Sequence, residues 1–397
     1  MGFCTTDMRQ QFGGDHLGAA FLLSLCCLFL PGCAQAQANP EVQATTVVTV
    51  ASLDELTDHL NARRVPERIA LAPGRYETLS LSNREFSSEV TLTSADANSP
   101  AILDGLKLRA VNNLTISNIA VRPSNDSGGA GRYGMLVLES SNIIIDGVAF
   151  VGPGAEISRH YVAGLMLRES VGLTVRRSYF RNFRHGMAML EVTKTRIVLN
   201  EFEGLQTDAI RGGGVADLLI QNNVMTDFRP AEGDHPDGIQ LWSTRQKKPG
   251  RNIVIEGNLV ARGQGSPTQG VFIRDTKLQL PFEKVAIRNN LVLGSLYNGI
   301  AVTGAVGVVV EDNSVYSTSD RKSWIRLQSV AQAVSRDNTA LQFIYRDNAD
   351  PVLDEGNAIN QPVDVAQPSI IRNWVANVSG FSEYQGPVLG RLLAKGR

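Results

Sequence analysis

The residues best suited to chemistry lie in one stretch, Gly233-Asp234-His235-Pro236-Asp237-Gly238-Ile239-Gln240-Leu241-Trp242. His235 and Asp237 flank a proline, whose ring restricts the backbone between them. Histidine is the side chain most easily used as a general base near neutral pH, and Asp237 could orient the imidazole or carry a proton itself. His-Pro and Asp-Gly are also ordinary turn dipeptides, so the stretch alone is equally consistent with a structural turn.

Similar polar groups recur one repeat before and one repeat after this stretch. Asp208 and Arg211 precede it, and Gln269 and Arg274 follow it. If these segments are adjacent parallel strands about 4.8 Å apart, the carboxylates of Asp208 and Asp237 stack in a row with Gln269. Two stacked carboxylates repel unless one is protonated or both are partnered, so a purely structural explanation would need a reason for them.

Further candidates share the outward-facing positions of the same repeats. We expect a substrate to contact Asp208, Gln240, Trp242, Gln269, His185 and Arg168. Trp242 suits stacking against a sugar ring, although packing beneath the insertion 243–251 explains it equally well. Polar groups on these repeats, and long insertions at 151–161, 226–235 and 243–251, indicate a binding site on one face.

The elements that position these residues are short repeated strands. Eight segments share one apolar frame, with aligned residues Ile116, Ile145, Val175, Ile197, Ile220, Ile255, Ile287 and Val310. A second apolar segment precedes each of the later ones, as in Gly238–Trp242 and Gly270–Arg274. A base period of about 22–23 residues with insertions is typical of a solenoid. No repeat has room for a crossover helix, so we predict an all-β, right-handed parallel β-helix with two short strands per repeat, from about residue 66 to 345.

Three further features support the solenoid. Asn200, Asn223, Asn258, Asn290 and Asn313 share one position, where stacked amides can form a hydrogen-bonded ladder. Residues 52–64 predict an N-terminal capping helix that begins at Ser52 and has Glu55 in a capping box. The tail is less regular from about residue 329, and we expect Trp374 and Phe381 to cap the other end of the solenoid.

The N-terminal segment predicts export. An apolar run from Leu17 to Leu30 is too short for a comfortable membrane span and is followed by small-x-small cleavage patterns at 34–38. We therefore expect residues 1–38 to be a signal peptide and 39–397 to be a single β-helix domain in the periplasm or outside the cell, with no transmembrane segment. Leu30–Cys33 also resembles a lipobox, so a lipid anchor on Cys33 is the alternative. All four cysteines lie in this segment, which leaves the mature chain without a disulfide or thiolate site.

Net charge limits the class of partner. The formal charge of the 397-residue chain is −1, which argues against a nucleic-acid partner that needs a strong basic field. Attraction for a charged substrate must then come from local clusters. The candidates are Arg176, Arg177, Arg181, Arg184 and His185, and then Arg245, Lys247, Lys248 and Arg251. Together these clusters could attract a polyanion, and we expect the protein to be a monomer.

These motifs resemble a known family. The chain looks like the pectin-lyase-like superfamily in its segment Ile69–Tyr76, its asparagine-bearing repeats and its Asp-His-Pro-Asp-Gly-Ile-Gln stretch. The combination of that stretch with Gln269–Arg274 resembles bacterial lyases of uronate polymers such as alginate or polyglucuronate. The resemblance implies β-elimination, in which a base takes the C5 proton of a uronate and the O4-linked sugar leaves. Arg211 or Gln240 would neutralise the carboxylate, and His235 or Arg274 would be base and acid, with His235 preferred as base because arginine has a pKa above about 12.

Three alternatives stay open. Mannuronan epimerases carry Asp-Pro-His-Asp, whereas Asp234–Asp237 here has the middle pair exchanged. A glycoside hydrolase would use Asp208 and Asp237 as its acid and base. A surface solenoid that only binds carbohydrate is the non-enzymatic option. No cofactor is implied with certainty; calcium serves some relatives, but no acidic cluster here has clear calcium-ligand spacing, so the metal is left unknown.

Overall fold

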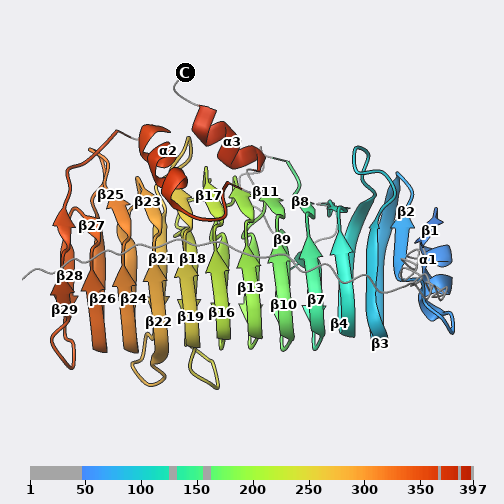
Figure 1. Ribbon diagram of the computed structural model, residues 1–397, viewed down its shortest axis with the longest axis horizontal. Helices are drawn as coiled ribbons and strands as arrows, with labels where there is room; N and C mark the ends of the chain where they lie inside the picture. Colours follow the sequence, from blue (N-terminus) through green and yellow to red (C-terminus); the bar gives the residue numbers. More distant parts are fainter. Residues whose placement is uncertain (1–46, 125–131, 155–161, 365–367, 383–385, 395–397) are drawn as a thin grey trace, which may run out of the picture. The chain divides into compact units, whose positions relative to one another are not determined.

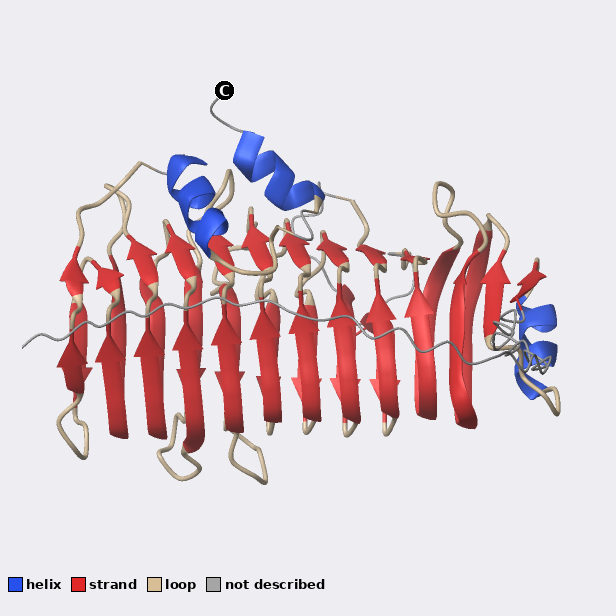
Figure 2. Ribbon diagram, viewed as in Figure 1, coloured by secondary structure: helices blue, strands red, loops and turns tan. Residues whose placement is uncertain are grey.

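The computed structural model describes residues 47–124, 132–154, 162–364, 368–382 and 386–394. The predicted signal peptide and Cys33 lie outside the described residues. The described chain forms a parallel β-helix in which thirty strands stack coil on coil (Figures 1 and 2). Every strand pairing is parallel apart from one isolated bridge near Thr318. The predicted right-handed, all-β solenoid is therefore confirmed. Among the described residues no helix is long and apolar enough to cross a membrane.

Each coil contributes to three ladders of hydrogen-bonded strands, which we number in chain order. Ladder I contains β6 (Arg132–Leu138), β9 (Val162–Arg168), β12 (Met187–Leu190), β15 (Ile210–Gly213), β18 (Asp237–Trp242), β21 (Gln269–Arg274) and β28 (Phe343–Arg346). Ladder II contains β1 (Val47–Val50), β2 (Arg68–Leu71), β7 (Ser141–Asp146), β10 (Val171–Arg176), β13 (Thr193–Val198), β16 (Ala216–Gln221), β19 (Arg251–Glu256), β22 (Phe282–Arg288) and β29 (Leu353–Glu355).

Ladder III consists of very short strands. They are β5 (Ala120–Val121), β8 (Ala149–Val151), β11 (Tyr179–Arg181), β14 (Glu201–Glu203), β17 (Val224–Thr226), β20 (Leu259–Ala261), β23 (Leu291–Leu293), β25 (Ser314–Tyr316), β27 (Thr339–Ala340) and β30 (Ala358–Ile359). Four long strands bend through more than one ladder: β3 (Arg75–Ser94), β4 (Ile102–Ser117), β24 (Tyr297–Glu311) and β26 (Ser323–Arg336).

The prediction of two strands per repeat was wrong, because each nine-residue segment bends and becomes two strands. The residue before the ladder asparagine has a positive φ, 59° at Leu199 and 54° at Asn222, and this turns the chain from ladder II into ladder III. The asparagines stack as predicted. Asn223 Nδ2 donates to Asn258 Oδ1 at 2.9 Å, and the backbone N–H of Asn223 donates to the same oxygen at 3.0 Å. Buried amides thereby satisfy the polar backbone that the bend exposes.

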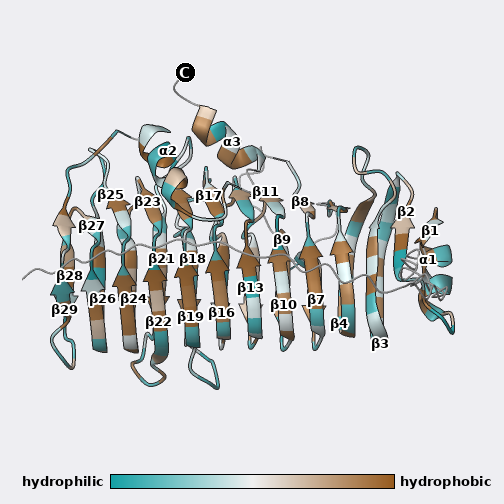
Figure 3. Cartoon of the chain, in the orientation of Figure 1, coloured by the Kyte–Doolittle hydropathy of each residue, from teal (hydrophilic) through white to brown (hydrophobic). Residues whose placement is uncertain are grey.

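The interior is a continuous apolar core. Phe150, Phe180 and Phe202 stack on consecutive coils with ring centroids 4.4 and 4.8 Å apart, which confirms the predicted register. Hydrophobic residues dominate the strands of the middle coils, whereas the loops that join ladder I to ladder II are hydrophilic (brown and teal in Figure 3). The coil also extends beyond the predicted limits, because β1 precedes the expected first strand and β30 follows residue 345.

The N-terminal cap is confirmed. Helix α1 (Leu53–Asn61) begins after Ser52, whose side-chain oxygen accepts a hydrogen bond from the backbone N–H of Glu55 at 3.1 Å. Glu55 in turn accepts from the backbone N–H of Ala51 at 2.8 Å. Leu56 and Leu60 are buried in the core, so the helix covers the apolar end of the stack. Figure 1 shows it beside β1 and β2.

The C-terminal cap was predicted in the wrong place. Helices α2 (Pro368–Asn377) and α3 (Pro387–Ala394) lie along ladder III and do not close the last coil (Figure 1). Phe381 and Leu389 pack with Leu259 and Leu291 on the outer side of ladder III. The reason is that this side of β17, β20 and β23 is apolar, and burial of apolar surface favours covering it.

Candidate functional site

The strand register places the predicted outward residues of ladder I in columns, as the sequence frames predicted. Asp237 pairs with Gln269, Arg211 with Gln240, and Trp242 with Arg274. The backbone N–H of Asp237 also donates to the Asp208 carboxylate at 3.1 Å, so these two acids lie on consecutive coils. The structure therefore brings the central candidates of three coils onto one face.

A glycine corner turns Asp237 outward. At Gly238 an added Cβ would approach Val260 Cγ2 to 2.7 Å, so this position faces the interior of the coil. Ile239 is fully buried as well, and two successive inward positions break the usual alternation. The carboxylate before the corner consequently lies beside Gln240 on the outer face. Glycine is required there because any larger residue would clash with the ladder III side chains.

Both carboxylates are buried, and all four of their oxygens are engaged. Asp208 is 2% exposed and Asp237 is 0% exposed. Asp208 Oδ1 accepts from the backbone of Asp237, and Asp208 Oδ2 forms an ion pair with Arg211 Nη1 at 3.0 Å. Asp237 Oδ1 accepts from Gln269 Nε2 at 2.7 Å, and Oδ2 accepts from Gln240 Nε2 at 2.5 Å. The pair therefore anchors the side chains that cover it.

Burial also changes the acidity of the pair. Desolvation raises the pKa of Asp208 to about 6, although the Arg211 charge opposes this shift. Desolvation first, and then the Asp208 charge, raise the pKa of Asp237 well above its ordinary value. The two acids favour a state that retains a proton, which answers the question of how stacked carboxylates avoid repulsion.

Arg211 is held from two sides and still reaches solvent. Its guanidinium pairs with Asp208 and lies 5.0 Å from the ring centroid of Trp242. The Arg211 side chain remains 31% exposed. Trp242 thus packs against the arginine and is itself partly exposed. A planar, preoriented guanidinium is well suited to bind a carboxylate from solution.

His235 is exposed on a loop that is anchored on both sides of it. Asp234 Oδ2 accepts from Gln206 Nε2 at 2.6 Å, and the carbonyl oxygen of Pro236 accepts from Thr268 Oγ1 at 2.6 Å. The imidazole of His235 is accessible to a ligand. The side chain of His235 is exposed, whereas that of Asp237, two residues further along the chain, is buried.

The buried histidine has a different environment. His185 is 8% exposed, its ring stacks edge-on against Tyr133 at 5.6 Å, and neither ring nitrogen has a hydrogen-bond partner among the described residues. Burial first, and then the charges of Arg211 and Arg184, lower the pKa of His185 to about 3. This imidazole is neutral and weakly basic, whereas the imidazole of His235 is accessible to a ligand.

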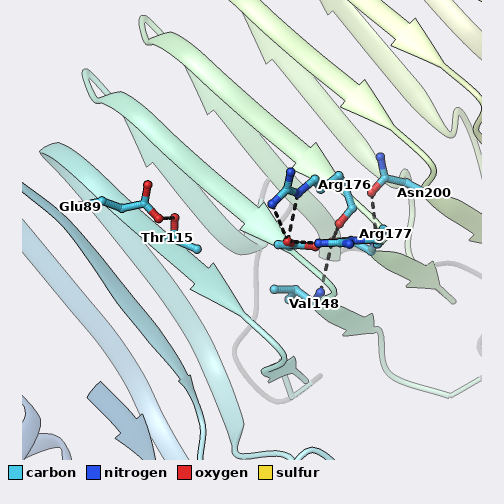
Figure 4. A network of polar contacts seen from close by, with 8 residues as sticks. Glu89, Thr115, Val148, Arg176, Arg177 and Asn200 are labelled. Atoms are coloured by element: carbon cyan, nitrogen blue, oxygen red, sulfur yellow. Dashed lines mark hydrogen bonds and ion pairs between the residues drawn. The ribbon is translucent and has the colours of Figure 1, made fainter. Parts of the chain in front are cut away.

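Two predicted groups lie apart from the central row. Arg168 pairs with Glu169 at 3.0 Å and lines a cavity of about 290 Å³ with Arg109 and Glu139. Arg176 and Arg177 both hydrogen-bond Asp146, as Figure 4 shows, and are on ladder II or its edge. Burial favours a higher pKa for Asp146, but the two arginines outweigh it and lower that pKa. The carboxylate of Asp146 thus offsets one of the two positive charges.

The polar row extends further than the sequence reasoning followed it. Asn298 Nδ2 donates to Gln269 Oε1, and Trp324 Nε1 donates to Asn298 Oδ1 at 3.1 Å. Trp324 begins the segment Trp324–Gln328, in which Ile325 and Leu327 face inward like the earlier repeats. This repeat pattern is the sequence signal that predicts the extension of the polar row to Trp324, and it lies before the less regular tail expected from about residue 329.

The donor set does not favour a metal. Within the parts of the chain that the structure describes, no three His, Cys, Asp or Glu side chains converge in a way that could hold a metal ion. The site instead combines an outward guanidinium, an accessible imidazole and an aromatic ring above a buried acid pair. Such a set can bind an anionic sugar and move a proton.

Comparison with known proteins agrees with the fold. A family model described as a right-handed β-helix region matches residues 103–315. An alginate lyase from Paenibacillus sp. str. FPU-7 is similar in structure, with 16% identity, a TM-score of 0.50, and coverage of 81% of this chain and 100% of that one. No curated protein was found to match the sequence.

Two other solved structures are similar at lower scores. A surface adhesin of Streptococcus pneumoniae has 12% identity and a TM-score of 0.47 over 78% of this chain and 80% of its own. A periplasmic alginate epimerase has 12% identity and a TM-score of 0.47 over 80% and 83%.

Proposed function

The chain belongs to the right-handed β-helix family, and on that premise we propose that it is an enzyme that cleaves an anionic, uronate-containing polysaccharide by β-elimination. The proposal rests on the surroundings and the exposure of the Arg211 side chain. Its guanidinium is fixed by a buried carboxylate and an indole ring yet stays 31% exposed. An anion is the natural partner for the remaining N–H groups.

The proposed reaction uses Arg211 to neutralise the carboxylate of the uronate. This makes the C5 proton more acidic, because the charge that develops on the carboxylate is stabilised. The exposed imidazole of His235 takes that proton, and the electron pair forms the C4–C5 double bond. The C4–O4 bond then breaks, and the leaving oxygen takes up a proton from water. Asp208 positions Arg211, and Trp242 supports the sugar ring.

The hydrolase alternative fits the geometry less well. An acid and base that attack a glycosidic bond must reach the substrate or an attacking water. All four oxygens of Asp208 and Asp237 already accept hydrogen bonds, and both side chains are buried. The acid pair is better suited to positioning Arg211 than to direct attack.

The first experiment is a panel of polyuronates assayed for the ultraviolet absorbance of the unsaturated product. We expect one polymer to give this product and His235→Ala to lower turnover by about 10²–10⁴-fold. Because His235 is exposed, the midpoint of thermal unfolding should stay nearly unchanged. Arg211→Ala should lower turnover similarly and also reduce stability, since it leaves the Asp208 carboxylate unpaired. Arg336→Ala, an exposed ladder II arginine, is the matched control.

The outcomes separate the candidate reactions. Deuterium incorporation at C5 without an unsaturated product would favour the epimerase, which shares the proton abstraction. New reducing ends without unsaturation would favour a hydrolase. Full activity of both His235→Ala and Arg211→Ala on the best substrate would show that the site assignment is wrong.

A further inference from the structure

A second cationic group lies further along ladder I, beyond the acid pair. Arg274 ends β21, and Arg326 in β26 is in the column that runs through Phe272 and Ala301. Within the described part of the chain neither arginine makes a hydrogen bond or an ion pair, and the Nε of Arg326 is buried without a partner. Two arginines without counter-charges on a protein surface are matched to an anionic ligand.

The nearby acids do not neutralise these arginines. Asp275 accepts hydrogen bonds from the Ser243 hydroxyl at 2.6 Å and from the backbone N–H of Leu280 at 2.7 Å. Asp347 pairs with Arg346 at 3.5 Å. Burial, and then the charge of Arg274, lower the pKa of Arg326, so the two cations are near enough to repel one another.

An exposed aromatic pair lies on the same coils. The rings of Tyr297 and Trp324 stack with centroids 5.4 Å apart, and Trp324 is fixed by its hydrogen bond to Asn298. Tyr297 is 53% exposed and has a φ of 55°, which is uncommon for a bulky residue and persists only where the surroundings impose it. Exposed, fixed aromatic rings suit stacking against a sugar ring.

The register sets the distance between this group and the acid pair. Asp237, Gln269, Asn298 and Trp324 follow one another on four consecutive coils. At about 4.8 Å per coil, Trp324 lies about 14 Å from Asp237 along the solenoid axis. A single sugar unit cannot reach both positions, whereas an extended oligosaccharide along the axis can.

We propose that Arg274, Arg326 and the Tyr297–Trp324 pair form a further binding subsite for acidic sugar units of the same polymer, so that the protein holds a run of several uronates parallel to its axis. The arginines bind carboxylates, and the aromatic pair supports a ring face. This inference rests on the proposed function, because it extends the same substrate beyond Arg211.

The test measures binding of uronate oligosaccharides of defined length by calorimetry. His235→Ala serves as the background, so that the ligand is not consumed. We expect Arg274→Ala/Arg326→Ala to weaken binding of a hexasaccharide by about tenfold or more and to leave disaccharide binding unchanged. The loss should shrink at high salt because exposed charges are screened. Arg346→Ala on the same ladder, which is paired with Asp347, is the matched control.

Trp324→Ala gives an independent measurement, because it removes the aromatic support and keeps both charges. We expect a similar selective loss for the hexasaccharide. If Arg326→Ala lowers the midpoint of thermal unfolding, Arg326→Gln replaces it, since glutamine keeps the length of the buried stem. Equal binding of a neutral glucan hexasaccharide, or unchanged hexasaccharide affinity in the double variant, would overturn the subsite.

The failure of this inference differs from the failure of the proposed function. Polyuronate cleavage by the unmodified protein, with an unchanged KM in the double variant, would overturn the subsite and leave the lyase standing. Selective loss of hexasaccharide binding without any unsaturated product from the unmodified protein would overturn the lyase and leave the subsite standing.

Discussion

At the residue scale, a buried acid pair controls a surface arginine. Asp208 and Asp237 do not face the solvent, but Arg211, Gln240 and Gln269 are all held by them. Replacing any one covering residue leaves a buried oxygen without its donor, which costs about 1–3 kcal/mol. The pair therefore couples the position of the anion-binding group to its own protonation.

This coupling predicts a pH dependence of substrate binding. The pKa of Asp208 is raised to about 6, so its carboxylate is charged above that pH and holds Arg211. Below it, protonation removes the ion pair, and we expect KM for the polyuronate to rise. Asp208→Asn should show the higher KM at all pH values and lose this acidic limb. An acidic limb that is identical in Asp208→Asn would contradict the assignment.

The raised pKa of Asp208 also predicts that the free energy of unfolding changes with pH, in the direction opposite to that produced by an ordinary surface ion pair. Because the folded-state pKa lies above the ordinary value of 3.8, the folded protein binds more protons between about pH 4 and 6. The free energy of unfolding should fall as pH rises through this window, and Asp208→Asn should flatten the slope. Denaturant titrations at several pH values measure it; a slope that is unchanged in the variant would count against the coupled pair.

At the element scale, the strands are held by stacked side chains of one type. The Phe150, Phe180 and Phe202 rings are nearly parallel and fully buried. Phe180→Ala removes the middle ring, and we expect a loss of about 3–5 kcal/mol in the free energy of unfolding. Chemical denaturation measures the loss, and a change below about 1 kcal/mol would mean that neighbouring coils can close the cavity.

Helix α3 depends on one buried carboxylate. Glu201 in β14 is 2% exposed and accepts from the backbone N–H groups of Val388 and Leu389 at 3.0 and 2.8 Å. Glu201→Ala should release the start of the helix, since these N–H groups lose their partner. We expect faster hydrogen exchange at 387–394 and unchanged protection of the ladders. Equal protection of α3 in both proteins would show that its apolar face is sufficient.

At the scale of the whole molecule, the solenoid brings three zones of one face into line. These zones are the exposed arginine above the acid pair, the rim loop with His235, and the distal arginines beside the aromatic pair. The loops that join ladder I to ladder II are hydrophilic, and α2 and α3 pack on ladder III. A long, straight ligand fits this arrangement because consecutive coils repeat at a constant spacing.

Export is the prediction that belongs to the whole chain. We propose that the mature protein begins near residues 36–39, or alternatively at a lipid-modified Cys33, because of the apolar run and cleavage pattern before them. Mass spectrometry of the protein isolated from its own cells distinguishes these N-termini. An intact Met1 would contradict both.

The solenoid, its parallel register and the columns of ladder I could all be predicted from the sequence. Each follows from a short repeated pattern: alternate apolar residues, a turn asparagine, and a glycine before the second strand. The capping helix was predictable for the same reason, since Ser52 and Glu55 are local signals. The periodic sequence pattern predicts the fold well because every coil packs on a coil of nearly the same structure.

The surroundings of each side chain in the site could not be predicted from the sequence. Nothing local shows that Asp208 and Asp237 are buried while His235 is exposed, because burial depends on insertions and on side chains from neighbouring coils. The path of α2 and α3 also follows from distant apolar residues of ladder III. Burial also raises the pKa values of Asp208 and Asp237. We therefore assign these two acids to positioning Arg211 and not to direct catalysis.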